Sequence, residues 1–253
     1  CCIDLVATTA AEDIHSSTAA YIEGAGVRLV QALSTLRAVG TNELLIDGLA
    51  AKIVPPTDRE KQLVAAESVD PAAIKAAHGL TRPFLTKDIA GAAAFSPTLN
   101  IAGLTGGYEG EGVKTVLPHT ARAKLDIRLV PDLDPEEVAE LVRQHLARHG
   151  FGDIKVEYLM GEKSYRSGLD APLVTRITDV AQTVYGSDKV ELLPSSAGTG
   201  PMYLFNHYLH APLLAFGVGY AKSGPHAPNE NIRISDFHQG IDFLTDIFAD
   251  LAK

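Results

Sequence analysis

Cysteine, long apolar runs and positive charge are all scarce in this sequence, and each shortage excludes a class of protein. The two cysteines, Cys1 and Cys2, are adjacent and cannot link distant segments, so a disulfide framework is excluded. No apolar run approaches the roughly 18 residues of a membrane span, and no signal-peptide pattern opens the chain. Lys and Arg number 22 against 31 Asp and Glu, a net charge of -9 that disfavours nucleic acid or an anionic membrane as partner. We therefore expect a cytoplasmic protein.

The remaining composition is that of a folded domain. The 253 residues are 46% hydrophobic and 21% charged, which is ordinary for a globular chain and excludes intrinsic disorder. The length suits one large domain or two small ones. Because the chain starts Cys-Cys without a methionine, we expect it to be a piece of a longer protein.

Residues 1–162 alternate strand and helix patterns in a recognisable order. Residues 121–130 alternate in polarity, with Ala123, Leu125, Ile127 and Leu129 on one face. A helix begins at Asp134-Pro135 and closes at Gly150. Strands are also predicted at 3–9, 98–104 and 154–159, and a helix at 24–38. The order strand, helix, strand, strand, helix, strand predicts a ferredoxin-like split βαβ domain. Residues 40–97, which have many prolines, are interpreted as an insertion of short helices and loops after the first helix.

Residues 163–253 have α/β character. Helices are predicted from Asp170 to Gly186 and from Ser235 onward, and strands at 190–193 and 212–218. The last helix should bury the stripe Phe237, Ile241, Leu244, Phe248 and Leu251. About 90 residues is small for an independent α/β domain, so we interpret this region as the terminal part of a larger sheet domain.

Several motifs have ordinary structural explanations. His145 and His149 have the i, i+4 spacing of two zinc ligands, but Leu146 stands where a zincin helix carries Glu, and the helix end favours histidine. We favour a structural role for both. Glu136-Glu137 matches the first turn of a capped helix. The segment Ser195–Gly200 is not a nucleophile elbow, and the glycine-rich loop 106–112 fits no nucleotide motif.

Two histidine clusters are less easily explained as structural. His226 lies between two prolines in Gly224-Pro225-His226-Ala227-Pro228, directly after an apolar segment, and rigid backbone suits a residue that must be held in place. A metal-ligand role and a surface role are equally open on this pattern alone. His15 lies in the polar segment 11–17 after the first strand, which could equally be a helix-capping turn.

These clusters, together with two further motifs, resemble the M20 family of metallopeptidases, and most closely its dipeptidase branch. The further motifs are Lys114-Thr115-Val116-Leu117-Pro118 and Asp126-Ile127-Arg128-Leu129-Val130-Pro131. The resemblance covers nearly the whole chain in order. It implies that residues 1–162 form a lid and dimerisation domain, and that residues 163–253 form the C-terminal part of an α/β zinc-peptidase catalytic domain.

The resemblance also assigns expected roles. His226 matches a zinc ligand. His15 matches a catalytic histidine that reaches the partner subunit's active site. Thr115 and Arg128 match lid positions that bind the substrate carboxylate, and Gly198 with Thr199 matches a substrate-contacting loop. Two zinc ions per active site are implied, with manganese or cobalt as alternatives, and so is a homodimer formed through the lid.

The sequence departs from the family in one large respect. No histidine is followed two residues later by Asp, so the family's His-x-Asp motif is absent, as are its other carboxylate ligands and general base. We therefore expect the N-terminal catalytic half to lie outside this chain, and the chain alone to be inactive. The expected activity of the whole enzyme is hydrolysis of short peptides with a free C-terminal carboxylate. An N-acyl amino acid hydrolase is the enzymatic alternative, and a non-catalytic dimerisation or ligand-sensing module is the alternative of another class.

Overall fold

Alternating apolar and polar residues form a four-stranded antiparallel sheet in the computed structural model, which describes residues 1–196 and 198–253. The strands are β1 (Cys2–Thr8), β3 (Thr98–Gly106), β5 (Thr120–Arg128) and β6 (Lys155–Met160), in the spatial order β3-β5-β1-β6. Leu125 and Ile127 of β5 are buried as the alternation predicts, whereas Leu129 lies beyond the end of the strand and is only partly buried.

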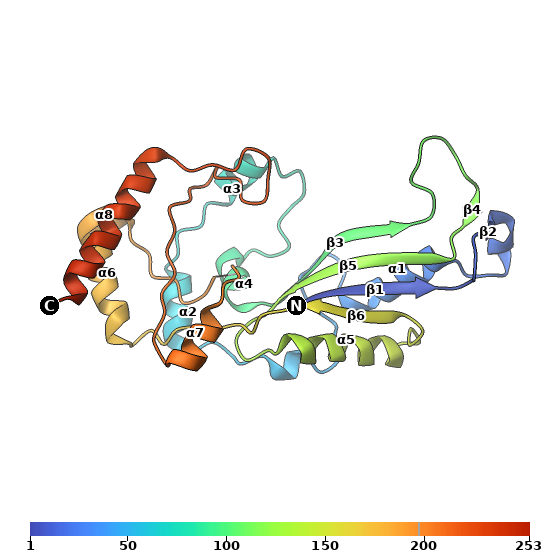
Figure 1. The fold of residues 1–253 in the computed structure, drawn as a ribbon, viewed down its shortest axis with the longest axis horizontal. Helices are drawn as coiled ribbons and strands as arrows, with labels where there is room; N and C mark the ends of the chain where they lie inside the picture. The colour runs from blue at the N-terminus through green and yellow to red at the C-terminus, as the bar shows by residue number, and fades with distance from the viewer. Residues whose placement is uncertain (197) are drawn as a thin grey trace.

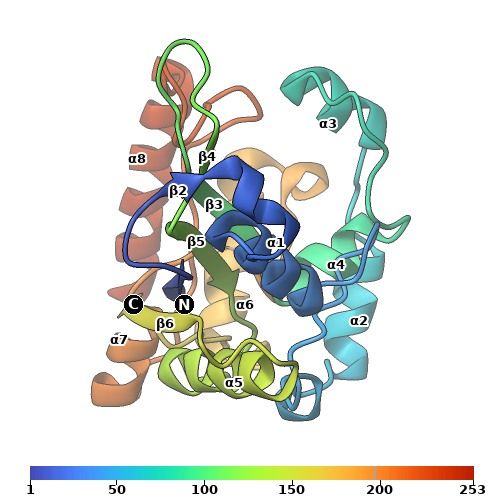
Figure 2. The same ribbon diagram turned by 90° about the vertical axis from the view of Figure 1, so that its right-hand side faces the viewer.

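Two amphipathic helices, α1 (Ala25–Leu36) and α5 (Pro135–Arg148), pack against this sheet, and their buried side chains join those of the strands in one core (Figure 2). Helix α5 begins as the sequence predicts, because the Asp134 carboxylate accepts hydrogen bonds from the Glu136 and Glu137 N–H groups. The strand order and the two helices confirm the ferredoxin-like arrangement.

A second, two-stranded sheet lies at one end of this region. Strands β2 (Ile14–His15) and β4 (Val116–Leu117) pair in antiparallel fashion, and the 3-10 helix η1 (Ser16–Ala20) follows β2 directly. Figure 1 shows this small sheet at the end of the molecule opposite to α6 and α8.

The segment 40–97 contains short helices, as predicted. They are η2 (Ala50–Lys52), α2 (Asp58–Ala65), α3 (Pro71–His78) and α4 (Ile89–Phe95). Thr57 caps α2 in a full capping box, and Asp70 caps α3. Part of the insertion contacts the C-terminal region, because the Arg166 guanidinium donates to the largely buried Glu60 carboxylate at 2.8 Å.

The C-terminal region contains α6 (Pro172–Tyr185), η3 (Ser187–Lys189), α7 (Met202–Leu209) and α8 (Ile234–Leu251). The predicted strands at 190–193 and 212–218 are wrong: both segments are loops. A strand needs a second strand that pairs with it through backbone hydrogen bonds, and no strand in the described part of the chain pairs with either segment. Helix α7, which the sequence analysis missed, starts after Pro201.

Two helix starts and one helix face also require correction. Ala171, not Asp170, is the N-cap of α6, and α8 begins one residue before Ser235, after Arg233. Helix α8 packs on α6 through Phe243 and Ile247. The predicted stripe on α8 is instead exposed; it comprises Phe237, Ile241, Leu244, Phe248 and Leu251. Among the described residues, no helix combines the length and apolar character needed to cross a bilayer.

Candidate functional site

Arg128 and Thr199, which are 71 residues apart in sequence, are in direct contact. Arg128 is the last residue of β5, and its Nη1 donates to the Thr199 hydroxyl at 2.6 Å. Its Nε donates to the Asp126 carboxylate at 3.2 Å, which fixes the plane of the guanidinium. Two residues expected to bind substrate are thus brought together where the sheet meets the C-terminal region.

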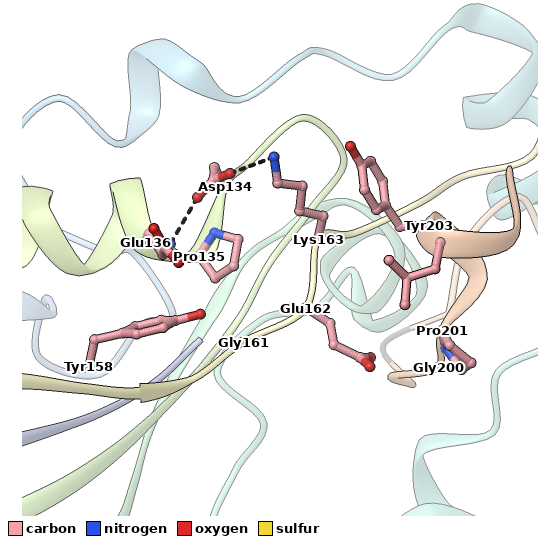
Figure 3. Close-up of a pocket in the computed structure, with 11 residues that line it drawn as sticks. Asp134, Pro135, Glu136, Tyr158, Gly161, Glu162, Lys163, Gly200, Pro201 and Tyr203 are labelled. Carbon is pink, nitrogen blue, oxygen red and sulfur yellow. Dashed lines mark hydrogen bonds and ion pairs between the residues drawn. The ribbon is translucent and has the colours of Figure 1, made fainter. Parts of the chain in front are cut away.

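The loop that carries Gly198 and Thr199 has no regular secondary structure among its described residues. The Gly198 N–H donates to Ser196 Oγ at 3.2 Å, and Ala197, within the segment Ser195–Gly200, lies outside the described residues. After the loop, α7 lies beside the start of α5 across a cavity of about 470 Å³ (Figure 3).

The sequence analysis missed a residue in this cavity. The Lys163 ammonium pairs with the Asp134 carboxylate at 2.8 Å and lies 5.5 Å from the centre of the Tyr203 ring. The hydrogen bond from Lys163 holds the pKa of Asp134 below its usual value. Asp134 therefore caps α5 and also binds the segment that leads into the C-terminal region. A lone Lys in Gly161-Glu162-Lys163 gives no sequence signal for this contact.

His15 and Thr115 lie near each other at the small β2–β4 sheet. His15 pairs with Val116 in the β2–β4 ladder, and the N–H of Ser16 donates to the Thr115 carbonyl at 3.3 Å. The His15 Nδ1 accepts a hydrogen bond from the Ser17 N–H at 3.2 Å, so the ring proton is on Nε2. Because the ring is exposed, this Nε2–H is free to donate to another molecule.

The Arg128–Thr199 contact and the small sheet with His15 lie beyond opposite ends of strand β5. Strand β5 begins at Thr120, next to β4, and ends at Arg128. Nine extended residues span roughly 27 Å. Figure 1 shows β2 and β4 beyond the far end of β5. His15 therefore cannot touch a small molecule held by Arg128 of the same chain.

His226 is held by a closed loop. The Tyr220 N–H donates to Ser223 Oγ at 2.8 Å, and the Asn231 N–H donates to the Ser223 carbonyl at 2.9 Å, which closes the base of the loop. His226 itself is exposed and has a φ of 62°, a left-handed conformation that costs energy in a non-glycine residue. Among the described residues, the one group of three potential metal ligands lies elsewhere, at Asp47, His145 and His149.

Residues 4–153 match the model of the peptidase dimerisation domain of the M20 family. The chain belongs to the M20 peptidase family. It is 28% identical to the Cys-Gly metallodipeptidase DUG1 of Saccharomyces cerevisiae, over 90% of this chain and 49% of DUG1. It is 24% identical to Beta-Ala-His dipeptidase of Rattus norvegicus, over 96% of this chain and 50% of that enzyme.

A solved structure supports the same relationship. The M20 family metallo-carboxypeptidase Sso-CP2 of Sulfolobus solfataricus is 36% identical, with a TM-score of 0.86 over 99% of this chain and 57% of that structure. The chain spans about half the length of the curated relatives it matches. The expected family is therefore confirmed.

Proposed function

We propose that this chain is the dimerisation and substrate-carboxylate-binding part of an M20 metallopeptidase that hydrolyses dipeptides or short peptides. In this proposal residues 1–162 form the lid and residues 163–253 belong to the catalytic domain. The contact between Arg128 and Thr199 carries the proposal, because it joins two expected substrate-binding residues from the two regions.

Arg128 has the chemistry to bind a terminal carboxylate. Its side chain is 42% exposed, Nη1 and Nε bond Thr199 and Asp126, and no hydrogen bond joins Nη2 to the described part of the chain. A guanidinium binds a carboxylate in a planar, bidentate manner that an ammonium cannot reproduce. Thr199, Thr115 and the Gly198 backbone are proposed to complete the contacts to the substrate.

His15 is proposed to act on a substrate bound by a second copy of the chain. Its exposed Nε2–H would donate to the carbonyl oxygen as negative charge develops on it. The length of β5 separates His15 from Arg128 within one chain, which supports a role across a homodimer formed through residues 1–162. The match to a peptidase dimerisation domain supports the same assembly.

The described residues do not fit a two-metal centre by themselves. His226 is the expected zinc ligand, but it belongs to no group of three potential ligands in the described part of the chain. The other ligands of two zinc ions, or of manganese or cobalt, and the general base are proposed to come from polypeptide outside this chain. We derive no metal-dependent step from these residues, and we expect the chain alone to be inactive. The scarcity of cysteine supports a cytoplasmic location.

The carboxylate contact is tested by Arg128→Lys in the full-length enzyme. Removing one partner of a desolvated charge pair typically costs about 2–5 kcal/mol. We expect kcat/KM to fall at least about tenfold for dipeptides with a free carboxylate, and much less for the same peptides with an amidated C-terminus. Arg122→Lys is the matched control, because Arg122 pairs with Asp4 and Glu157 on the same sheet. Equal losses on both substrates would show that Arg128 does not bind the carboxylate.

The role of His15 is tested by mixing two inactive variants. Subunits carrying His15→Ala keep an intact metal site, and subunits carrying His226→Ala keep His15. Mixed dimers should regain activity, whereas each homodimer should stay inactive. Verified mixed dimers without activity would reject action across the dimer. N-acyl amino acids assayed beside dipeptides would distinguish the amidohydrolase alternative, and a full-length protein without hydrolase activity would favour the non-catalytic module.

A further inference from the structure

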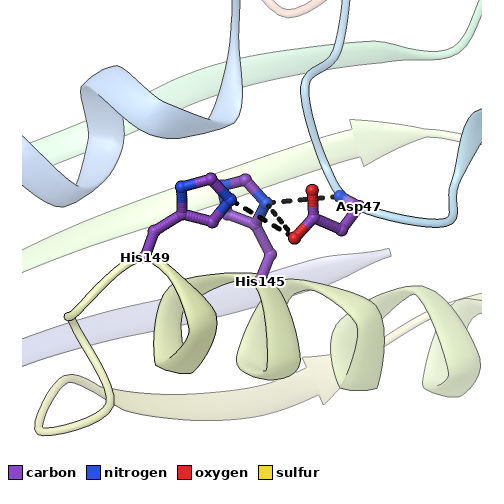
Figure 4. Close-up of side chains that lie close together, drawn as sticks. All are labelled: Asp47, His145 and His149. Atoms are coloured by element: carbon purple, nitrogen blue, oxygen red, sulfur yellow. Dashed lines mark hydrogen bonds and ion pairs between the residues drawn. The ribbon is translucent and has the colours of Figure 1, made fainter.

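Asp47, His145 and His149 converge on one point at the C-terminal end of α5 (Figure 4). The two histidines lie one helical turn apart, with ring centroids 4.0 Å apart, and Asp47 reaches them from the loop after α1. Ile46 and Leu49 are buried in the core on either side of Asp47, and Gly48 takes a φ of 83° to turn the chain between them. The carboxylate is thus held in place by the fold.

The two separations from Asp47 match those of ligands that share one metal ion, and ligand atoms of all three residues lie within 4.8 Å of one another. The Asp47 Oδ2 lies 3.5 Å from His145 Nδ1 and 3.3 Å from His149 Nε2. Tetrahedral ligands at zinc bond lengths of about 2.0–2.2 Å are about 3.3–3.6 Å apart. We propose that Asp47, His145 and His149 form a binding site for a divalent zinc-class cation, separate from the proposed catalytic centre at His226.

The hydrogen bonds around His145 prepare one ring nitrogen for a metal. The Thr35 hydroxyl donates to the Ala32 carbonyl at 2.7 Å, so it accepts from His145 Nε2–H at 3.1 Å. The His145 Nδ1 is therefore unprotonated and directs its lone pair toward Asp47. A histidine ligand whose other nitrogen donates to a fixed acceptor is the usual arrangement at metal sites.

Three existing contacts would have to give way to the cation. The Asp47 N–H donates to His145 Nδ1 at 3.2 Å, Arg148 Nε donates to Asp47 Oδ2 at 2.9 Å, and His149 Nε2–H donates to the same oxygen at 3.3 Å. The hydrogen bond from the Asp47 N–H is long, Arg148 is half exposed and can swing into solvent, and the His149 proton would move to Nδ1 when Nε2 binds the metal. His149 is 44% exposed, which leaves an entry path and room for water as a fourth ligand. The cation would join the loop after α1 to the end of α5.

The test is calorimetric titration of the 253-residue chain with zinc chloride in a buffer that does not chelate metals. We expect one zinc ion per chain in the wild type. His149→Ala and Asp47→Ala should each weaken zinc binding at least about tenfold. Even the loss of a residue that only hydrogen-bonds to a metal ligand typically lowers metal affinity about 10–100-fold, and the loss of a ligand should cost no less. Both side chains are partly exposed, and thermal melts without zinc check that the variants fold. Cobalt provides a second readout, because tetrahedral binding gives intense visible absorption that both variants should lose.

His226→Ala and His78→Ala are the matched controls. His226 is the proposed catalytic ligand, and His78 is an exposed histidine at the end of α3. Both variants should bind zinc as the wild type does. The proposal is overturned if the wild type takes up no stoichiometric zinc, if His149→Ala binds zinc equally well, or if His226→Ala loses the binding. Because no peptidase assay is involved, this result is independent of the proposed enzymatic function.

Discussion

The N-terminal region (1–162) and the C-terminal region (163–253) differ in how they bury their apolar patterns. In the N-terminal region the strands and both helices share one continuous core, in which Leu5, Leu29 and Leu125 are almost completely buried. In the C-terminal region the corresponding cluster of buried residues is small: Ala181, Phe243 and Ile247. An apolar pattern predicts a packed face only where the same chain supplies its partner.

Helix α8 illustrates the difference most directly. It is apolar on two faces, and α6 covers only the face with Phe243 and Ile247. A second apolar face on a helix normally packs against another element of the domain. The exposed stripe is thus what we expect if residues 163–253 belong to a larger α/β domain, as proposed.

A large loss of stability is expected from a cavity in the core of the N-terminal region. Leu125→Ala removes a side chain that is 2% exposed at the centre of β5. The cavity should lower the free energy of unfolding by about 2–5 kcal/mol, as measured by urea denaturation followed by circular dichroism. Lys124→Ala, on the opposite, exposed face of the strand, is the control and should change little.

A smaller effect is expected where the two regions meet. Asp134→Ala removes the cap of α5 and the partner of Lys163, which together should cost about 1–2 kcal/mol. Lys163→Gln removes only the partly exposed ion pair and should cost less than about 1 kcal/mol. Equal losses for the two variants would mean that the cap contributes nothing, contrary to the geometry.

The stability of the N-terminal region should depend on pH partly through Asp153. The hydrogen bond from Arg28 lowers the pKa of Asp153 below its usual value of 3.8. Since the folded-state pKa is the lower one, the stabilisation is complete above pH 3.8 and is lost as the pH falls through the folded-state pKa. The difference in free energy of unfolding between the wild type and Asp153→Asn should be below about 1 kcal/mol at neutral pH. Urea denaturation repeated at decreasing pH should show this difference disappear. A difference that persists at low pH would exclude this linkage.

The smallest expected effect is on α8. Leu244→Ala truncates a side chain that is 40% exposed, and in this chain it should change stability by no more than about 0.5 kcal/mol. The neighbouring Phe243→Ala, which is 3% exposed, should cost about 3–5 kcal/mol. A large loss for Leu244→Ala in the full-length protein, but not in this chain, would show that another segment covers the stripe.

The sequence analysis succeeded where local signals and their partners coincide. Asp134-Pro135 caps α5, and the alternation of Leu125 and Ile127 places β5 in the core, because both depend on neighbouring residues or on strands within the same region. The segment 212–218 failed for the opposite reason. Its apolar composition fits a strand, but no described strand lies beside it to form hydrogen bonds.

The candidate site was predictable in its residues but not in its grouping. The motifs pointed to His15, Thr115, Arg128, Gly198, Thr199 and His226. Spacing along the chain could not show that Arg128 meets Thr199 while His15 lies at the far end of β5. The roles of these residues remain predictions. For His145 and His149 the sequence favoured a structural role, and the proposed cation site adds to it. Its third member, Asp47, lies 98 residues before His145 and belongs to no motif, so spacing could not reveal it.

The sequence by itself determined the four main strands and two main helices of the N-terminal region, their order and the family motifs, because periodicity, capping and turn residues act over a few neighbouring positions. It did not predict the small β2–β4 sheet. The tertiary structure alone decided which distant polar groups meet: Arg128 with Thr199, Lys163 with Asp134, and Asp47 with His145 and His149. It also decided that one face of α8 stays uncovered. The physical reason is that a side chain's contacts across the fold depend on the packing of whole helices and strands, which no local pattern encodes.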